Sequence, residues 1–205
     1  MRDRVGGRER GLDKSLAAAQ SGEEAGFARL WRAYQPSLLR YLQVLVGSAA
    51  EDVASETWLQ VARDVSGYRG DADGFRVWLF RVARHRAIDD RRWVRRRPEE
   101  LVEPLGVPDA GVPDAWVGVA ENLDTAWALA VIGTLPPDQA EAVLLRVVVG
   151  LDVAGTAKVL GKRAGAVRVA TLRGLRRLAE HTEIRQRRAP VPATGVTPWS
   201  AATPG

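Results

Sequence analysis

Apolar residues recur at three- and four-residue spacings along most of the chain, and this spacing predicts α-helices. The clearest run occupies residues 27–45, where one face carries Phe27, Leu30, Trp31, Tyr34, Leu38, Tyr41, Leu42 and Leu45. A second run places Val53, Thr57 and Val61 on one side, and a third begins near Asp73. No stretch shows the strict alternation of a half-buried strand. The pattern therefore predicts an all-α fold.

Two serine–glutamate pairs mark where the first helices are expected to begin. Ser21 precedes Glu24 at the spacing of a capping box, in which the two side chains accept hydrogen bonds from N–H groups at the start of a helix. The same spacing separates Ser48 from Glu51. Residues 1–20 precede the first pair and are expected to form a flexible extension.

Charged residues divide the chain into blocks. Residues 81–97 hold eight Arg and two Asp, whereas residues 99–126 hold seven acidic residues and no Lys or Arg. Residues 158–188 are basic again, with ten Lys and Arg against two Glu. Prolines and glycines in the acidic block favour an extended linker over packed structure. The charge pattern therefore predicts two small helical domains joined by a flexible acidic linker.

The expected boundaries follow from these blocks. They are an extension at 1–20, a first domain at 21–98, the acidic linker at 99–122, a second domain at 123–185 and a tail at 186–205. The tail is rich in Pro, Ala and Thr and is expected to be disordered.

Composition narrows the range of functions. The 205 residues include no cysteine and two histidines, which excludes disulfides, zinc fingers and thiol catalysis. A net charge of +5 favours an anionic partner. The first residues lack the apolar stretch of a signal peptide, and the apolar run at 142–151 is too short to span a bilayer. We therefore expect a cytoplasmic protein with no membrane insertion, no metal site and no cofactor.

Residues 153–172 have the spacing of a helix-turn-helix, within the second predicted domain. Ala157 provides the small residue where the two helices touch, and Gly161, four residues later, provides a backbone free to adopt positive φ. Val167 provides the buried branched residue that positions the second helix. The alternative is an ordinary helical hairpin with a solvated basic face. The positive charge of this block favours DNA binding.

The second helix of this motif is predicted to turn a basic and apolar face outward. Inward positions are Val167, Ala170, Thr171, Gly174, Leu175 and Leu178, and outward positions are Arg168, Val169, Leu172, Arg173 and Arg176. Arginines bind phosphates or guanine edges, and apolar side chains suit thymine methyl groups in a major groove. Lys162 and Arg163, where the helix begins, suit the phosphate backbone.

Several blocks of the sequence match one known family in order. In the first domain they are AEDV and ETWL within 50–59, YRGDADGFRVWLFRVAR at 68–84 and AIDDRR at 87–92. In the second they are LPPDQAEAVLLRVVVGL at 135–151 and VLGKRAGAVRVATLRGLRRLA at 159–179. Together they resemble bacterial RNA polymerase sigma factors, most closely the two-domain extracytoplasmic-function (ECF) group. The resemblance implies a non-catalytic subunit that binds core polymerase, recognises the −35 and −10 promoter elements and initiates DNA melting.

The resemblance also implies where the polymerase binds. In the family, an acidic helix of the first domain docks on a coiled coil of the beta-prime subunit, and the beta flap is the expected contact of the second domain. The positions that match the docking helix are Glu51, Asp52, Glu56 and Gln60. A cluster of carboxylates complements a basic partner. The alternative is a set of solvated acids stabilised by the helix dipole.

For the −10 element, the resemblance implicates the arginine-rich third helix and the loop after it. Bases turned out of the nontemplate strand require cationic groups and flat surfaces. The positions that supply them are Arg84, His85, Asp89, Arg91, Arg92, Trp93, Arg95 and Arg96. Phe75, Trp78 and Phe80 are expected to belong mostly to the core. For Trp93, stacking on a base and folding back over the domain both stay open.

The chain departs from the family pattern at two places. His85 stands where many relatives carry asparagine, which leaves the −10 base preference open. Ala154 and Gly155 stand where relatives often carry acidic residues, so the first helix of the motif is expected to be less stable or differently packed. The acidic linker is expected either to imitate nucleic acid inside polymerase channels or to be an inert spacer.

Two other functions compete with this interpretation. A stand-alone helix-turn-helix regulator would bind duplex DNA without polymerase. A hydrolase or transferase has less support, because the sequence shows no phosphate-cradling glycine loop, metal-ligand cluster or nucleophile–base pair. Sigma factors of this group are often inhibited by an anti-sigma partner, but the sequence does not identify one here.

Overall fold

The computed structural model describes residues 2–96, 123–182 and 184, with side chains for 11–96, 124–182 and 184. Within this part of the chain there are helices and turns but no strand, so the predicted all-α fold is confirmed. The α-helices are α1 (Arg2–Gln20), α2 (Glu24–Val46), α3 (Ala50–Asp64), α4 (Ala72–Arg96), α6 (Leu123–Gly133), α7 (Pro137–Val143), α8 (Val153–Leu160) and α9 (Ala164–Glu180). Two 3₁₀ turns (Gly47–Ala49 and Val65–Gly67) and a π-helical turn (Leu144–Val148) connect some of them. The predicted acidic linker and tail lie outside the described residues.

Helices α2, α3 and α4 pack around an aromatic core in the first half of the chain. Tyr41, Phe75 and Phe80 are fully buried. The rings of Tyr41 and Phe80 meet edge to face with centroids 5.5 Å apart. Trp78 is half-buried and stacks on Tyr68 at 5.2 Å. The core positions predicted for Phe75 and Phe80 are confirmed, whereas Trp78 lies at the edge of the core.

The first twenty residues contain a helix, although the sequence suggested a flexible extension. Leu16 and Ala19 of α1 are buried, and α1 packs against α2. The two helices approach so closely that a Cβ atom at Gly26 would lie 2.6 Å from the backbone nitrogen of Ala19. The Asp13 carboxylate also accepts a hydrogen bond of 2.8 Å from the backbone N–H of Ala72, at the start of α4. α1 is therefore part of the packed first half.

The predicted capping boxes do not form. Ser21 is the first residue after α1, and its hydroxyl donates to the carbonyl oxygen of Ala17 at 3.1 Å instead of capping α2. The N-cap of α2 is Glu23, which makes no side-chain cap. Helix α3 begins after a 3₁₀ turn with Ala49 at its N-cap and no side-chain cap. A side-chain cap is present at α8, where the Asp152 carboxylate accepts a hydrogen bond of 2.6 Å from the backbone N–H of Gly155.

Helices α8 and α9 form the predicted helix-turn-helix. Gly161 adopts the left-handed conformation, with φ 64° and ψ 33°. Val167 is fully buried and Ala157 is half-buried. Helix α7 crosses α9 at Gly174, where a Cβ atom would lie 2.8 Å from Cγ2 of Val143. The glycine in mid-helix therefore allows α7 and α9 to pack closely.

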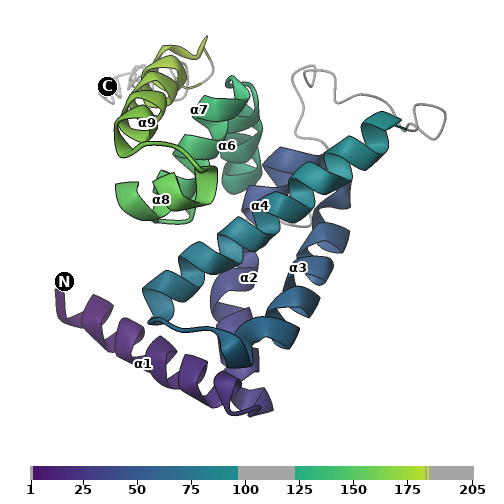
Figure 1. Ribbon diagram of the computed structural model, residues 1–205. Helices are drawn as coiled ribbons and strands as arrows, with labels where there is room; N and C mark the ends of the chain where they lie inside the picture. The colour runs from purple at the N-terminus through teal and green to yellow at the C-terminus, as the bar shows by residue number, and fades with distance from the viewer. Residues whose placement is uncertain (1, 97–122, 183, 185–205) are drawn as a thin grey trace, which may run out of the picture.

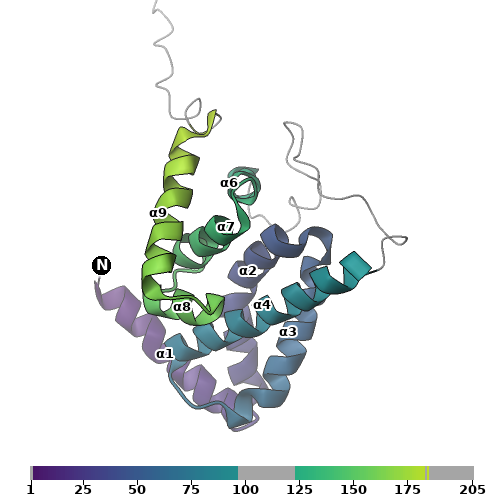
Figure 2. The ribbon, with the colours of Figure 1, turned by 45° about the horizontal axis from the view of Figure 1, so that its top comes forward.

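The two halves of the chain also pack against each other. Helix α8 lies beside α4, and α2 contacts α6 and the π-helical turn (Figures 1 and 2). Buried side chains from both halves, including Leu42 and Leu145, form one apolar cluster. The sequence predicted two domains joined by a tether, without a contact between them. None of the described helices is long and apolar enough to cross a membrane.

Candidate functional site

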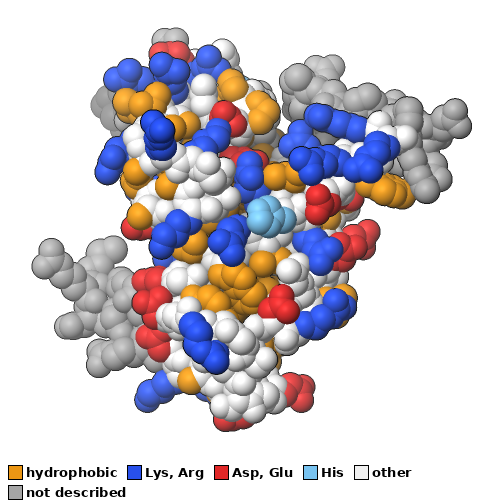
Figure 3. Space-filling model, viewed as in Figure 1, with side chains coloured by type: hydrophobic (Ala, Val, Ile, Leu, Met, Phe, Trp, Pro, Cys, Tyr) orange, Lys and Arg blue, Asp and Glu red, His pale blue; other side chains and the backbone are white. Residues whose placement is uncertain are grey.

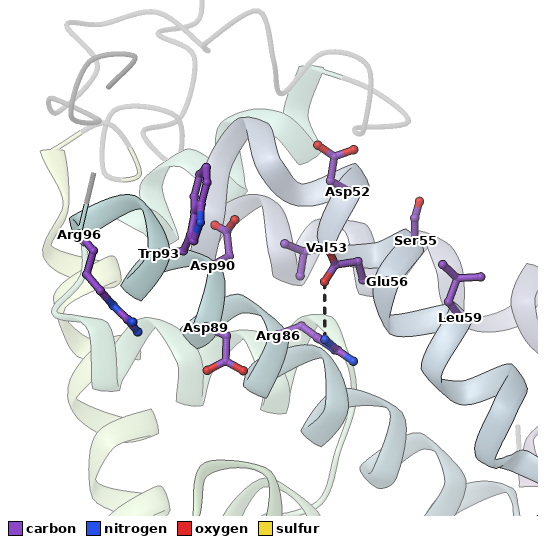
Figure 4. Close-up of a pocket in the computed structure, with 10 residues that line it drawn as sticks. All are labelled: Asp52, Val53, Ser55, Glu56, Leu59, Arg86, Asp89, Asp90, Trp93 and Arg96. Atoms are coloured by element: carbon purple, nitrogen blue, oxygen red, sulfur yellow. Dashed lines mark ion pairs between the residues drawn. The ribbon is translucent and has the colours of Figure 1, made fainter. Parts of the chain in front are cut away.

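A groove of about 780 Å³ lies between α3 and α4 (Figure 4). Helix α3 contributes Asp52, Val53, Ser55, Glu56 and Leu59, and helix α4 contributes Arg86, Asp89, Asp90, Trp93 and Arg96. On each helix these residues recur mostly at three- and four-residue spacings, so they form a stripe along one face. The groove is the space between the two stripes.

Negative side chains outnumber positive ones in this groove. Four carboxylates and two guanidinium groups line it: Asp52, Glu56, Asp89, Asp90, Arg86 and Arg96. Burial raises the pKa of Asp90, and the carboxylates of Glu56 and Asp52 raise it further. The negative charge is therefore incompletely compensated within the groove, which favours a cationic partner.

Arg86 connects the two helices across the groove. Its Nε and Nη2 atoms donate to Oε1 of Gln60 at 3.1 and 3.0 Å. Its Nη1 atom lies 3.8 Å from Oε2 of Glu56, and the two side chains point toward each other (Figure 4). Gln60 is half-buried, and its carbonyl oxygen is engaged by Arg86. Gln60 therefore orients Arg86 and presents little of its own surface to a partner.

The other predicted docking residues are exposed on α3. Glu51, Asp52 and Glu56 present their carboxylates to solvent, and Asp52 and Glu56 line the groove. Sequence reasoning missed Leu59, which is 57% exposed beside them. The sequence does contain a signal for it: a leucine three residues after Glu56 places an apolar side chain on the same acidic face, which indicates an apolar contact.

Most residues predicted to contact the −10 element lie exposed along the C-terminal half of α4. They are His85, Asp89, Arg91, Arg92, Trp93, Arg95 and Arg96. Figure 3 shows basic side chains gathered over this end of α4. Trp93 is 51% exposed and lines the groove, so its ring borders both the acidic groove and the arginines. Arg92 lies 3.8 Å from Asp89 in an exposed ion pair.

Arg84 is placed differently from the rest of this set. Its Nε atom donates to Oε2 of Glu141 on α7 at 2.9 Å, and the two side chains are 20% and 13% exposed. In this conformation Arg84 contacts the second half of the chain instead of lying open with the other cations. No local pattern predicts this contact, because the two residues are separated by 57 positions.

The residues predicted for the −35 element lie on the outer face of α9. The exposed ones include Arg163, Arg168, Val169, Leu172, Arg173 and Arg176, and Figure 3 shows basic side chains over this helix. Leu175, expected to point inward, is 42% exposed, because Gly174 occupies the position nearest α7. Lys162 already forms an ion pair within the protein, because its Nζ atom lies 2.6 Å from Oδ2 of Asp138 on α7.

These surfaces define a class of protein. A helix-turn-helix with an exposed basic face, and a second cationic helix beside an acidic groove, are typical of a DNA-binding protein that also docks on another protein. Among the described residues, no group of three or more His, Cys, Asp or Glu side chains is placed to hold a metal ion.

Comparison with known proteins identifies the family. Sigma-70 region 2 matches residues 30–97, and Sigma-70, region 4 matches residues 125–178. The chain is 33% identical over 178 residues to the ECF RNA polymerase sigma factor SigD of Mycobacterium tuberculosis (strain H37Rv), over 82% of each protein. It is 34% identical over 163 residues to the ECF RNA polymerase sigma factor BldN of Streptomyces coelicolor, over 78% of this chain and 62% of BldN. This chain belongs to the ECF RNA polymerase sigma factors.

Solved structures share the fold. CnrH, in complex with the cytosolic domain of CnrY, has a TM-score of 0.59 and 21% identity, over 87% of this chain and 99% of that chain. The sigma factor RpoE of Bartonella quintana, in complex with the anti-sigma factor NepR, has a TM-score of 0.58 and 20% identity, over 75% of this chain and 94% of that chain.

Proposed function

We propose that this sigma factor docks on core RNA polymerase through the groove between α3 and α4, holds the −10 element on the cationic end of α4 and reads the −35 element with α9. One observation carries the proposal: the incompletely compensated carboxylates of the groove lie directly beside the exposed arginines of α4. A surface for a basic protein and a surface for nucleic acid thus share one helix. A factor that joins polymerase to a promoter requires such an arrangement.

The docking partner is a basic and partly apolar helical surface, as the beta-prime coiled coil is in the family. Asp52, Glu56 and Asp90 attract its cations, and Leu59 and Trp93 offer apolar area. Opposite charges raise the rate of association and its specificity. Burying apolar surface favours binding by about 25 cal/mol per Å² of apolar area removed from water. A bound cation also relieves the repulsion among the carboxylates. The beta flap is the corresponding partner of the second half.

The −10 contact is made to single-stranded DNA. Arg91, Arg92, Arg95 and Arg96 bind phosphates along the C-terminal half of α4, and Trp93 supplies a flat surface for an unstacked base. Stacking on an aromatic side chain contributes about 1–3 kcal/mol per base. Trp93 is therefore the residue on which strand capture depends most.

The −35 contact is made to duplex DNA by α9. Arg168 and Arg173 reach guanine edges or phosphates, and Val169 and Leu172 contact thymine methyl groups. Arg163, exposed at the start of the helix, binds a phosphate. Contacts of these two kinds position the helix and select the sequence.

A protein with these contacts works in the bacterial cytoplasm and associates with the nucleoid when bound to polymerase. It is not itself a catalyst, because the chemistry of transcription belongs to the core enzyme. An anti-sigma factor is a further candidate partner, supported by the fold that the chain shares with RpoE, whose structure contains one. The docking groove and the DNA-binding faces are the surfaces that such a partner would cover.

A gel shift with and without core polymerase tests the proposed function. The free factor is expected to bind promoter DNA weakly and to open it only with core enzyme. Tight sequence-specific binding to duplex DNA without polymerase, and no transcript with it, would instead identify a stand-alone regulator.

Charge reversal tests the docking groove itself. Glu56→Lys is expected to lower the affinity for core polymerase at least about tenfold, because it removes an attractive charge and adds a repulsive one. Asp64→Lys reverses an exposed acid at the other end of α3, outside the groove, and is the matched control. Equal affinities for the two variants would place the docking site elsewhere.

A further inference from the structure

The outer face of α9 carries an apolar pair with an arginine on each side of it. Val169 and Leu172 are exposed in the middle of this face. Arg168 comes one residue before the pair and Arg173 one residue after it, and both are exposed. Because each residue turns the helix by about 100°, the two arginines lie about 70° to either side of the line through the apolar pair. Figure 3 shows hydrophobic and basic side chains interspersed over this helix.

The same face of α9 is open to close approach by another helix. Gly165 lies one turn before Val169 on this face, and a Cβ atom there would meet nothing within 4 Å. The opposite side of the helix is occupied, because Gly174 packs against Val143 of α7. The apolar pair therefore points away from the body of the second half.

The groove between α3 and α4 has the complementary arrangement. Both of its walls carry carboxylates, which are Asp52 and Glu56 on α3 and Asp89 and Asp90 on α4. Leu59 and Trp93 add exposed apolar surface at opposite ends of the groove (Figure 4). A helix with an apolar centre and a cation on each flank thus matches a groove with apolar ends and an anion on each wall.

The two surfaces also match in length. The groove follows α4 from Arg86 to Arg96, a rise of about 15 Å. The exposed face of α9 from Arg168 to Arg176 rises about 12 Å. Amphipathic helices bind in grooves through anchors spaced three and four residues apart, and Val169 and Leu172 have this spacing. One helix face can therefore fill the groove.

The two surfaces of one molecule lie apart. Helix α9 packs against α7 and α8, and Figures 1 and 2 both place α9 and α3 on opposite sides of the molecule. A groove and a helix face that match but do not meet within one chain can meet between two chains. Every solution of the free protein contains both surfaces at equal concentration.

The net charge of the chain does not prevent such a contact. Two copies with a charge of +5 each repel one another at long range. At physiological ionic strength, however, exposed charges more than about 8 Å apart are largely screened. Charges across a contact are closer than this. The attraction between the arginines of α9 and the carboxylates of the groove therefore outweighs the repulsion between the whole molecules.

We propose that the outer face of α9 of one copy binds in the groove between α3 and α4 of a second copy, so that the free factor associates with itself head to tail. The contact is heterologous, because two different surfaces meet. It covers the docking groove of one copy and the −35 face of the other. Core polymerase and promoter DNA therefore compete with it, and this competition, unlike the self-association, rests on the function proposed above.

The self-association is expected to be weak and to depend on salt. A single helix face in a groove belongs to the small, transient class of interfaces. Sedimentation velocity over about a hundredfold range of protein concentration should show a mass that rises with concentration. Raising the salt from about 0.1 to about 1 M shortens the screening length from about 10 to about 3 Å and should restore the monomer. A monomer at every concentration, or association unchanged at high salt, contradicts the proposal.

Two charge-reversal variants test which surfaces meet. Glu56→Lys changes the groove and leaves α9 intact, whereas Arg173→Glu changes α9 and leaves the groove intact. Each variant alone lacks one of the two surfaces and is expected to self-associate at least about tenfold more weakly than the natural protein. A mixture of the two variants contains one intact groove and one intact α9 face. It is expected to form a complex of one copy of each variant.

The matched controls reverse exposed charges outside both surfaces. They are Asp64→Lys at the far end of α3 and Lys158→Glu on α8. Both are expected to self-associate like the natural protein. A mixture of Glu56→Lys and Arg173→Glu that stays monomeric overturns the proposal, and so does loss of association in the two controls.

These measurements use neither polymerase nor DNA, so their outcome is independent of the function proposed above. Core polymerase added to the self-associated protein is expected to release the bound copy as it fills the groove. If polymerase binds without releasing that copy, the docking site proposed above is wrong and the self-association stands. If the mixture of variants does not associate while the natural protein still binds polymerase, the self-association is wrong and the docking site stands.

Discussion

Asp90 lines the proposed docking groove and also affects the stability of the free protein. Its carboxyl group is partly desolvated and lies near Glu56 and Asp52, and its pKa is raised for these reasons. A carboxyl group whose folded-state pKa is raised favours folding in its protonated form. That contribution is complete below the ordinary pKa of 3.8 and is lost as the pH rises through the raised value. Ionised Asp90 therefore opposes folding at neutral pH.

Asp90→Asn is expected to stabilise the free protein at pH 7 by less than about 1 kcal/mol, because the group is only partly buried. The gain should shrink as the pH falls toward 4, where Asp90 is itself protonated. Thermal unfolding at both pH values measures the difference. Asp89→Asn, at an exposed position that pairs with Arg92, is the control and should give no such gain. A loss of stability at pH 7 for Asp90→Asn would contradict the assignment.

Trp93 is the residue expected to hold an unstacked base. Trp93→Ala should weaken binding of the polymerase-bound factor to a −10 nontemplate strand by about 1–3 kcal/mol, the contribution of one base stacked on an aromatic ring. Trp93→Phe keeps a flat ring and should restore most of the affinity. Fluorescence anisotropy with a labelled oligonucleotide measures both variants. If the Ala and Phe variants bind equally, Trp93 does not act by stacking.

At the level of elements, the turn of the helix-turn-helix depends on Gly161. Its φ of 64° is unfavourable for a residue with a side chain, so Gly161→Ala should lower the free energy of unfolding by about 1 kcal/mol. Gly165 lies in α9, where an added Cβ atom meets nothing within 4 Å. Gly165→Ala should raise the free energy of unfolding by about 0.5–1 kcal/mol. Urea denaturation measures the free energy of unfolding of both variants. If the two substitutions changed that free energy in the same direction, the role given to Gly161 would be wrong.

The sequence predicted the elements whose faces are determined by local spacing. Most of the apolar face of 27–45, the core positions Phe75 and Phe80 and the left-handed Gly161 follow from residue type and spacing alone. Trp31, which was assigned to that face, is instead 43% exposed. Helix α1 was missed because its packing depends on distant residues. Its contact with α4 joins Asp13 to Ala72, 59 positions away, and no local pattern encodes that hydrogen bond.

The parts of the candidate site that lie on a single helix were predictable from the sequence. The exposed acids of α3 and the exposed arginines of α4 were each expected from their own segments. That Asp52 and Glu56 share a groove with Trp93 and Arg96 was not predictable, because the groove exists only where two helices pack. The burial of Arg84 against a distant helix was missed for the same reason.

In the whole molecule, the long helix α4 contributes residues to three different surfaces. The N-terminal part of α4 contacts α8 through Val77, and its C-terminal half carries the exposed arginines. Its side facing α3 forms the docking groove. Events on one side of the helix can therefore affect the others without a change of fold.

The most direct test of the account is run-off transcription from a genomic library by the purified protein with core polymerase, followed by mapping of transcript starts. We expect defined starts that share one pair of upstream elements, and none when either component is omitted. A protein that binds core polymerase without producing such starts, or that does not bind it, would contradict the account.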